Sequence, residues 1–369
     1  MLYGSEKEGN CQTIARVKSP EYSKETAYLK EELGLAMVIN PEYAAAEEIA
    51  RVLRFPSATR IEPFAKGRVE LVTFKVDKDS QLVGLSVKEL MIKYRLDVLV
   101  TAVERGDETY IPNGNFVFEE RDLVSISASV KNAYDFFVKI GKKGAHIKNA
   151  LVVGGDVISH YLCEILSRSG ISLTVVEKDV STCEELCANW DKVTVIHGET
   201  TDYDLLKEEG VETSDAFVAL SDSDEENILI SLFAKGAGSK KLITKINRID
   251  YADVAEKLEL DTIICPRNIT AGQILRYVRA TQNSRGSAMT ALYSINDTDV
   301  EASEFIVKKD SPIIGIPLSE LALKKDVLIA SIIRGKTVIV PRGHDTILEG
   351  DDVLVVCKTP LYDIAEILK

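Results

Sequence analysis

Short apolar runs alternate with helically spaced apolar residues between positions 150 and 266. The runs predict buried strands of a parallel sheet, and Ile158, Leu162 and Leu166 recur at the spacing of one helix face between the first two runs. Strands that alternate with helices predict an α/β fold with a Rossmann-like, doubly wound parallel sheet. The predicted strands are Ala150–Val153, Ile171–Val176, Val193–Ile196, Phe217–Leu220 and Leu242–Ile246.

Two helix starts are predicted between the later strands. The stretch Ser181-Thr-Cys-Glu184 matches a capping box, which predicts that a helix begins there. The stretch Asn227–Lys235 predicts a second helix, and the acidic turn Ser221–Glu226 precedes it. We interpret this turn as a solvated turn with a charged first helical turn, because it lacks the fixed geometry of a calcium loop.

The first predicted strand ends in the glycine turn Gly154-Gly155, and a helix follows. Such a turn points the unpaired N–H groups of the helix N-terminus at a ligand phosphate. Glu177 follows Gly154 by 177 − 154 = 23 positions. That separation is close to the offset of about 20 residues at which an acidic residue holds a ribose hydroxyl. The stretch therefore predicts a nucleotide site at the carboxyl edge of the sheet.

The glycine fingerprint of dinucleotide-binding turns is incomplete here. Against G-x-G-x-x-G, the chain reads Gly154-Gly155-Asp156-Val157-Ile158-Ser159, with only the first glycine in place. A carboxylate at Asp156, about 4 Å from a phosphate charge, opposes binding by about 4 kcal/mol at an effective dielectric of about 20. Two interpretations stay open. Either the site still binds a dinucleotide, or Asp156 caps the helix and fills the anion position with the protein's own carboxylate.

Polar residues also follow the other predicted strands. Gly198–Asp202, Ser221 and Arg248 each come after an apolar run, and ligands of such sheets bind at the carboxyl ends of the strands. A guanidinium that follows a buried strand needs an anion. Arg248 is therefore predicted to contact either a ligand or a structural carboxylate.

An internal repeat relates the two halves of the chain. Ile14–Tyr22 matches Ile243–Tyr251, and Arg105-Gly106 matches Arg334-Gly335, each at an offset of 243 − 14 = 334 − 105 = 229 residues. The chain therefore contains two copies of a module with a large α/β part and a small α+β lobe. No strand, glycine turn and helix precede Ile14, so we expect the first copy to be truncated rather than completed by another subunit.

The second small lobe is predicted from alternating apolar residues and turn signals. A helix is expected near Leu318–Leu323. The predicted strands are Glu304–Val307, Val327–Ile333, Thr337–Val340 and Asp352–Cys357.

Several of these stretches together carry a family resemblance. They are Val153-Gly154-Gly155, Val176-Glu177-Lys178, His197–Asp202, Ala219–Asn227 and Ile14–Tyr22. They resemble the TrkA family, the peripheral regulatory subunits of Trk potassium uptake systems. Members contain two RCK (KTN) units, each a Rossmann-like domain (RCK-N) followed by a small lobe (RCK-C). The resemblance implies a remnant of the first RCK-N domain at 1–66, an RCK-C lobe at 67–142, a second RCK-N domain at 147–281 and a second RCK-C lobe at 287–369.

The resemblance also implies site roles, with NAD(H) or ATP/ADP as the ligand and no metal. Gly154, Gly155, Asp156, Val157 and Ile158 would face a pyrophosphate, and Glu177 a ribose. Glu199 and Thr200 would lie on the adenine side, Ser221 and Arg248 at the far end of the ligand, and Arg16 would be the first copy's counterpart of Arg248.

The resemblance further implies a cytoplasmic protein, peripheral on the inner face of the plasma membrane. It would form a homodimer or tetramer, catalyse no reaction, and gate a membrane potassium-translocating subunit of the TrkH/TrkG type. Two alternatives remain open. One is an NAD(P)-dependent oxidoreductase, although no general acid, base or nucleophile motif stands out. The other is a degenerate RCK assembly subunit that no longer binds nucleotide.

Composition bears on the kinds of partner and the cellular compartment that we expect for this chain. The formal net charge of −13 and the isoelectric point of about 5.0 argue against nucleic acid as a partner. No apolar run approaches the length of about 18 residues that spans a bilayer, so we expect no direct lipid insertion. The six cysteines are scattered, which predicts reduced thiols in a cytoplasmic protein.

Overall fold

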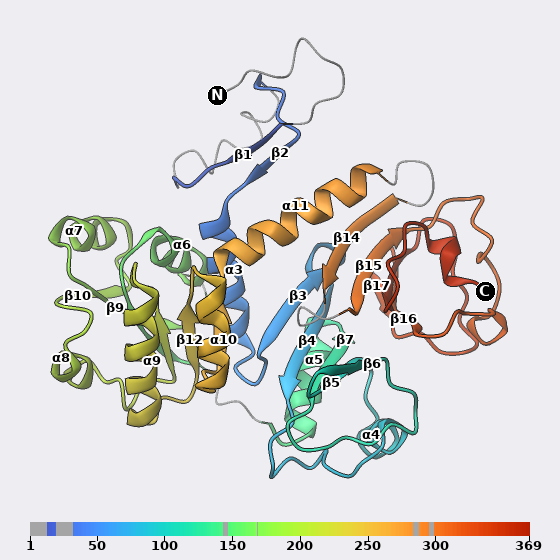
Figure 1. Ribbon diagram of the computed structural model, residues 1–369, viewed down its shortest axis with the longest axis horizontal. Coiled ribbons are helices and arrows are strands. Elements are labelled where there is room, and N and C mark those ends of the chain that lie inside the picture. The colour runs from blue at the N-terminus through green and yellow to red at the C-terminus, as the bar shows by residue number, and fades with distance from the viewer. Residues whose placement is uncertain (1–12, 20–31, 143–146, 168, 283–287, 295–298) are drawn as a thin grey trace. The chain divides into compact units, whose positions relative to one another are not determined.

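The computed structural model describes residues 13–19, 32–142, 147–167, 169–282, 288–294 and 299–369 (Figure 1). Part of the first repeat motif, residues 20–22, lies outside these ranges. The chain divides into two compact units. One comprises Met1–Pro56 with Ala145–Gln273, and the other comprises Ser57–Gly144 with Ile274–Lys369.

The first unit contains a six-stranded, fully parallel sheet with the order β10-β9-β8-β11-β12-β13. Its strands are β8 (Asn149–Val153), β9 (Ser172–Glu177), β10 (Val193–His197), β11 (Ala216–Ala219), β12 (Leu242–Lys245) and β13 (Thr262–Ile264). Numbered from β8, this is the 3-2-1-4-5-6 order of the doubly wound nucleotide-binding sheet. The prediction of a Rossmann-like fold is confirmed.

Helices cover both faces of this sheet. They are α3 (Pro41–Arg54), α6 (Val157–Leu166), α7 (Val180–Asn189), α8 (Tyr203–Glu208), α9 (Asp224–Ala237), α10 (Ile249–Lys257) and the part of α11 (Pro266–Gln282) up to Gln273. In β8, Ala150 and Val152 pack in one apolar cluster with α3, α6 and α7, whereas Leu151 and Val153 pack in another with α8 and α9. Because successive residues of a strand point to opposite faces, the continuous apolar runs bury both faces of the sheet.

The first copy of the large part contributes α3 and the parallel strands β1 (Ile14–Arg16) and β2 (Met37–Ile39) to this unit. Helix α3 packs along α6 of the second copy. The hydroxyl of Tyr161 in α6 accepts from Asn40 Nδ2 at 2.8 Å and donates to the Lys18 carbonyl at 3.2 Å. The rings of Tyr43 and Tyr161 pack edge to face, with their centroids 5.3 Å apart. A helix of the first copy thus covers part of the second copy's sheet.

Two predicted helix starts are wrong by a few residues. Helix α7 begins after Asp179, whose carboxylate accepts from the Thr182 N–H at 2.8 Å, so Ser181 is not the capping residue. Helix α9 begins at Asp224 rather than Asn227, with Ser223 as the cap. In both cases a nearer polar side chain satisfies the free N–H groups, and acidic residues in the first turn of α9 favour the earlier start.

The second unit contains two five-stranded antiparallel sheets of the same order, β3-β4-β7-β5-β6 and β14-β15-β18-β16-β17. The first consists of β3 (Arg60–Phe64), β4 (Val69–Lys75), β5 (Leu99–Arg105), β6 (Glu108–Tyr110) and β7 (Leu123–Ala128). The second consists of β14 (Ala288–Ser294), β15 (Glu301–Ile306), β16 (Val327–Arg334), β17 (Thr337–Ile339) and β18 (Asp352–Cys357). The duplication predicted for the small lobes is confirmed.

The repeat extends to details of each lobe. A register shift falls between Val100 and Ala102 in one sheet and between Ile329 and Ser331 in the other, 329 − 100 = 229 residues apart. Strand β3 belongs to the first lobe's sheet, so this lobe begins before position 67, the predicted boundary. The boundary was predicted too late because β3 forms a hairpin with β4, and the matched repeat segments did not reach β3.

Arg105 and Arg334, which match at the repeat offset, make the same contact in their two lobes. Arg105 forms two hydrogen bonds of 2.8 Å with the buried carboxylate of Asp122, and Arg334 does the same with Asp351 at 2.9 and 2.8 Å. These side-on pairs are charge-assisted and geometrically specific. In each lobe the arginine therefore links its strand to the turn that carries the buried aspartate.

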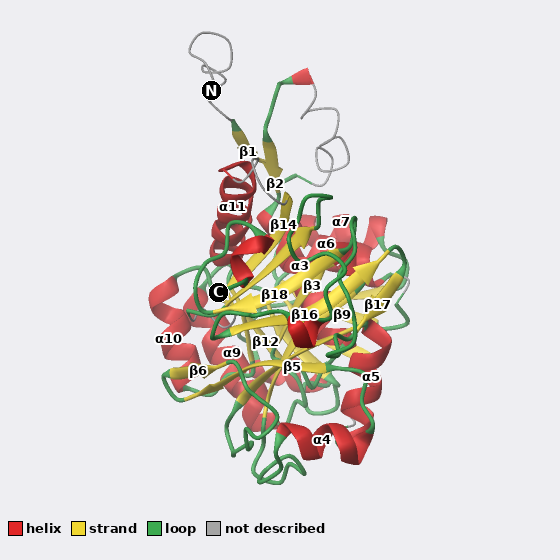
Figure 2. Ribbon diagram, turned by 90° about the vertical axis from the view of Figure 1, so that its right-hand side faces the viewer, coloured by secondary structure: helices red, strands yellow, loops and turns green. Residues whose placement is uncertain are grey.

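The first lobe contains two α-helices, whereas the described residues of the second lobe form 3-10 turns at the equivalent places, Leu318–Glu320 and Ile364–Ile367 (Figure 2). The first lobe contains α4 (Val87–Tyr94), which begins with a capping box between Ser86 and Glu89, and it ends with α5 (Val130–Lys139). The helix predicted near Leu318–Leu323 is wrong, because the second lobe forms a single 3-10 turn over Leu318–Glu320. The residue equivalent to Ser86, at 86 + 231 = 317, is Pro317, which makes no side-chain cap. The side-chain cap that begins α4 is therefore absent at the equivalent position of the second lobe.

Candidate nucleotide-binding site

The glycine turn lies between β8 and α6, at the carboxyl edge of the sheet. The Gly154 N–H donates to the Val176 carbonyl at 2.9 Å, and the φ angle of Gly154 is +104°. A Cβ at this position would lie 2.7 Å from the Leu220 carbonyl carbon and from the Ser221 nitrogen. Glycine is required here both by the backbone angle and by the close approach of the chain after β11.

Glu177 ends β9 beside this turn. Its carboxylate accepts from the Gly155 N–H and, at 2.8 Å, from the Asp179 N–H. The residue is 9% exposed. A Cβ on Gly155 would lie 2.9 Å from Glu177 Cγ, so only a glycine at this position leaves room for the Glu177 side chain. The structure thus places Glu177, the residue predicted to hold a ribose, directly against the predicted glycine turn.

Asp156 is the N-cap of α6. Its Oδ1 accepts from the Ile158 N–H at 2.9 Å and from the Ser159 N–H at 3.1 Å. The interpretation of Asp156 as a helix cap is confirmed. The side chain of Ile158 is 2% exposed and lies in the apolar cluster, and Val157 packs against the same cluster. These two side chains therefore point into the core.

The second oxygen of Asp156 contacts a residue that the sequence analysis missed. Lys245, the last residue of β12, donates from Nζ to Asp156 Oδ2 at 2.6 Å and to the Leu220 carbonyl at 3.0 Å. Lys245 is 3% exposed. Burial raises the pKa of the Asp156 carboxyl, while the Lys245 ammonium and the Ser159 N–H act in the opposite sense. The sequence offered two signals for Lys245: it is a cation at the end of an apolar strand, and the repeat offset of 229 residues matches it to Arg16.

Arg248 follows β12 by three residues, but the premise that its guanidinium is buried and needs an anion is wrong. The Arg248 side chain is 55% exposed and stacks over the Tyr251 ring at 4.4 Å. Asp250 is its carboxylate neighbour at 4.0 Å. The Arg248 N–H donates to Asp224 at 2.8 Å, so its backbone is tied to α9.

Arg16 is not the counterpart of Arg248. In the strand registers, Arg16 lies opposite Ile39 and Lys245 lies opposite Ile264, each as the last residue of its strand. Arg16 therefore corresponds to Lys245. Its guanidinium forms an ion pair with Glu42 in the first turn of α3. Both copies thus place a cation at this strand end and pair it with a carboxylate.

The remaining predicted residues lie at other strand ends. Ser221 is buried, and its N–H donates to the Asn227 side chain at 2.8 Å. Asn227 in turn donates to the Ser221 and Lys245 carbonyls at 3.0 and 3.1 Å. Thr200 is 4% exposed, and Glu199 is exposed. The buried Asn227 fixes the loop after β11 and was also missed by the sequence analysis.

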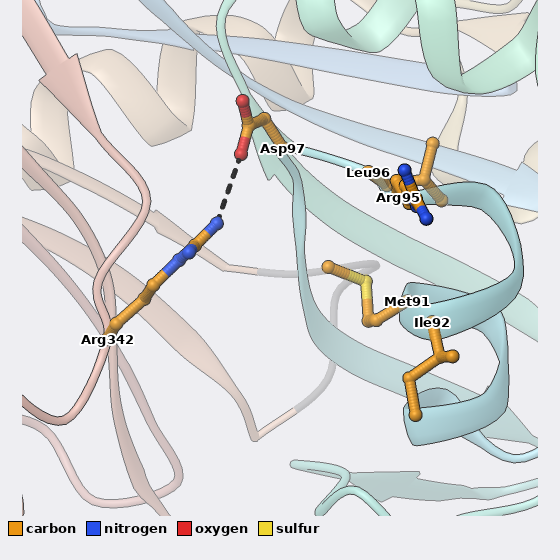
Figure 3. A pocket seen from close by; sticks show the side chains of 6 residues that line it. All are labelled: Met91, Ile92, Arg95, Leu96, Asp97 and Arg342. Atoms are coloured by element: carbon orange, nitrogen blue, oxygen red, sulfur yellow. Dashed lines mark hydrogen bonds and ion pairs between the residues drawn. The ribbon is translucent and has the colours of Figure 1, made fainter.

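A pocket of about 410 Å³ lies in the second unit (Figure 3). Met91, Ile92, Arg95 and Leu96 line it from α4 and the loop that follows. Asp97 and Arg342 form an ion pair of 3.5 Å there, between exposed side chains. Such exposed pairs contribute little to stability.

Within the described ranges, no three His, Cys, Asp or Glu side chains converge as a metal-binding group. The same residues include no helix that is long and apolar enough to cross a membrane.

The fold defines a Rossmann-type protein with a glycine turn at the switch point of its sheet and a duplicated small lobe. The TrkA-N domain model matches residues 150–266, and the TrkA-C domain model matches residues 71–141 and 302–366. The chain is 32% identical to Trk system potassium uptake protein TrkA homolog 1 of Methanosarcina mazei over 347 residues, covering 94% of this chain and 76% of the relative. The chain belongs to the TrkA family.

Other relatives agree. Trk system potassium uptake protein TrkA of Halomonas elongata is 30% identical over 366 residues, covering 96% of this chain and 78% of the relative. Among solved structures, the GsuK RCK domain matches with a TM-score of 0.56 at 15% identity, covering 94% of this chain and 72% of that chain. The GsuK channel bound to NAD matches with the same score and identity and covers 60% of that chain. These structures support the RCK fold.

Proposed function

We propose that this chain is a regulatory subunit of a Trk-type potassium uptake system. It binds NAD(H) or an adenine nucleotide at the carboxyl edge of its parallel sheet. Binding changes the conformation of the subunit and gates a membrane potassium-translocating partner of the TrkH/TrkG type. The role is non-catalytic, and the protein acts from the cytoplasmic face of the membrane as a homodimer or tetramer.

The observation that carries the proposal is the contact between the glycine turn and Glu177. In a sheet of this order, ligands bind where the strand order reverses, which is beside β8. Gly154 and Gly155 form the turn at that point, and Glu177 lies against it. The names of the curated relatives connect this architecture to potassium uptake.

Glu177 retains the capacity to bind a ribose. A carboxylate has about four acceptor sites on its two oxygens. The Gly155 N–H uses one site on Oε2, and the Asp179 N–H uses one on Oε1. One site on each oxygen remains for the two hydroxyls of a ribose, and the two N–H donors hold the carboxylate in position.

Calorimetry tests this proposal. NAD⁺, NADH, ATP, ADP and adenosine are titrated into the wild type, Glu177→Gln and the control Glu184→Gln, which changes an exposed residue of α7. We expect at least one ligand to bind the wild type, Glu177→Gln to weaken it by about tenfold or more, and Glu184→Gln to leave it unchanged. Saturable binding that is equal in all three proteins would contradict the assigned site.

A second candidate is an assembly subunit that no longer responds to nucleotide. The pairing of Asp156 with Lys245 favours it, because the protein's own charges already fill the phosphate position. Absence of binding by all five ligands, in a protein that still assembles with the membrane subunit, would select this candidate.

A further inference from the structure

Three N–H groups at the glycine turn and the start of α6, those of Gly155, Ile158 and Ser159, already donate to carboxylates of the protein. Asp156 Oδ1 accepts from Ile158 and Ser159, and Glu177 accepts from Gly155. The Ile158 and Ser159 N–H groups are among the donors that the N-terminus of such a helix offers to a ligand phosphate. A phosphate group placed against α6 therefore has to displace the Asp156 carboxylate.

The Asp156 carboxylate is also neutralised from the opposite side. Lys245 Nζ lies 2.6 Å from Asp156 Oδ2, and the lysine side chain is 4% exposed. A buried ammonium requires an anion, and Asp156 supplies it. The carboxylate thus combines helix N–H donors with a cationic partner, which is the environment that a bound phosphate would need. Its own side chain is 22% exposed, so it lies at the rim of this position.

We propose that the Asp156–Lys245 ion pair takes the place of a ligand phosphate at the start of α6 and thereby sets the ligand class of this site. The site selects the base and ribose of a nucleoside and gains no affinity from a pyrophosphate against α6. This inference rests on the proposed function, since it assumes that Glu177 holds a ribose. It predicts that adenosine binds at least as tightly as NAD⁺.

The matched substitution is Asp156→Asn, which keeps the size and capping ability of the side chain and removes its charge. The repulsion of a ligand phosphate is lost, and Lys245 becomes available to it. We expect NAD⁺ affinity to increase by about 10–100-fold at constant ionic strength, and adenosine affinity to change by less than about twofold.

Two further variants keep the test decisive. Asp156→Gly restores the glycine of the fingerprint and replaces Asp156→Asn in the test if that variant fails to fold. It should likewise bind NAD⁺ more tightly and leave adenosine affinity unchanged. Asp363→Asn is the charge-matched control, because Asp363 caps a turn of the second lobe with its carboxylate at 2.8 Å from the Ala365 nitrogen. This control should bind both ligands as the wild type does. Thermal unfolding followed by Trp190 fluorescence verifies that each variant is folded.

The outcomes separate the inference from the proposed function. Tighter binding of NAD⁺ than of adenosine by the wild type would overturn the inference alone, and so would an unchanged NAD⁺ affinity in both Asp156 variants. If neither ligand binds the wild type or the variants, both the inference and the proposed nucleotide response fail.

Discussion

Replacement of Gly154 by alanine tests the packing at the switch point. The structure predicts two separate costs. A side chain at φ +104° is strained by about 1–2 kcal/mol, as for other left-handed residues. Its Cβ would also lie 2.7 Å from backbone atoms of Leu220 and Ser221, and forcing such a contact costs about 1–3 kcal/mol. The free energy of unfolding should therefore fall by about 2–5 kcal/mol.

Gly170 provides the matched control. It also has a positive φ angle, +79°, but a Cβ there would meet nothing within 4 Å. Gly170→Ala should therefore cost only the strain of about 1–2 kcal/mol. The difference between the two variants isolates the close approach of the chain after β11.

Urea unfolding followed by fluorescence measures both variants. Trp190 is the single tryptophan of the chain and packs against the core cluster of the parallel sheet, so its signal reports this domain. The transition midpoint of Gly154→Ala should lie clearly below that of Gly170→Ala. Equal midpoints would refute the reasoning, because the close backbone contact would then carry no energy.

Two further predictions concern charged groups. Lys245→Met removes the buried partner of Asp156 and should lower stability by about 3 kcal/mol, whereas adding Asp156→Asn should recover part of the loss; full additivity in a double-mutant cycle would argue against a coupled pair. Hydrogen bonds from Lys240 and the backbone lower the pKa of Asp215, so its contribution is present above the unfolded pKa of about 3.9 and is lost as the pH falls through the lower folded value. Acid titration of unfolding from pH 6 to pH 2 should therefore destabilise the wild type more than Asp215→Asn, and parallel curves would contradict this assignment.

Local patterns predicted much of the fold. The apolar runs located five strands of the parallel sheet, because a strand buried on both faces has a distinctive sequence. The glycine turn and Glu177 were placed correctly, since their spacing reflects the length of one strand–helix–strand unit. The arginine and glycine matches at a constant offset predicted the duplicated lobes, whose register shifts and Arg–Asp pairs repeat in the structure.

Contacts between distant residues were not predictable in this way. The Lys245–Asp156 pair joins residues 89 positions apart, and nothing in the sequence near either residue indicates the other. The packing of α3 on α6 depends on Asn40 and Tyr161, which are 121 positions apart. Lys245 was missed because it lay inside the predicted strand Leu242–Ile246, whereas β12 ends at Lys245. Arg248, which follows the strand, was singled out as the cation that needs an anion, although its side chain is exposed.

The central claim is that occupancy of the site beside Glu177 controls potassium movement. Its most direct test is rubidium uptake by proteoliposomes that contain the membrane potassium-translocating partner and this protein, with and without the ligand that binds best. We predict that the ligand changes the uptake rate with the wild type and with Glu184→Gln, and that Glu177→Gln requires about tenfold more ligand or does not respond. An uptake rate that is unaffected by ligand in the wild type, or that responds equally in Glu177→Gln, would contradict the account.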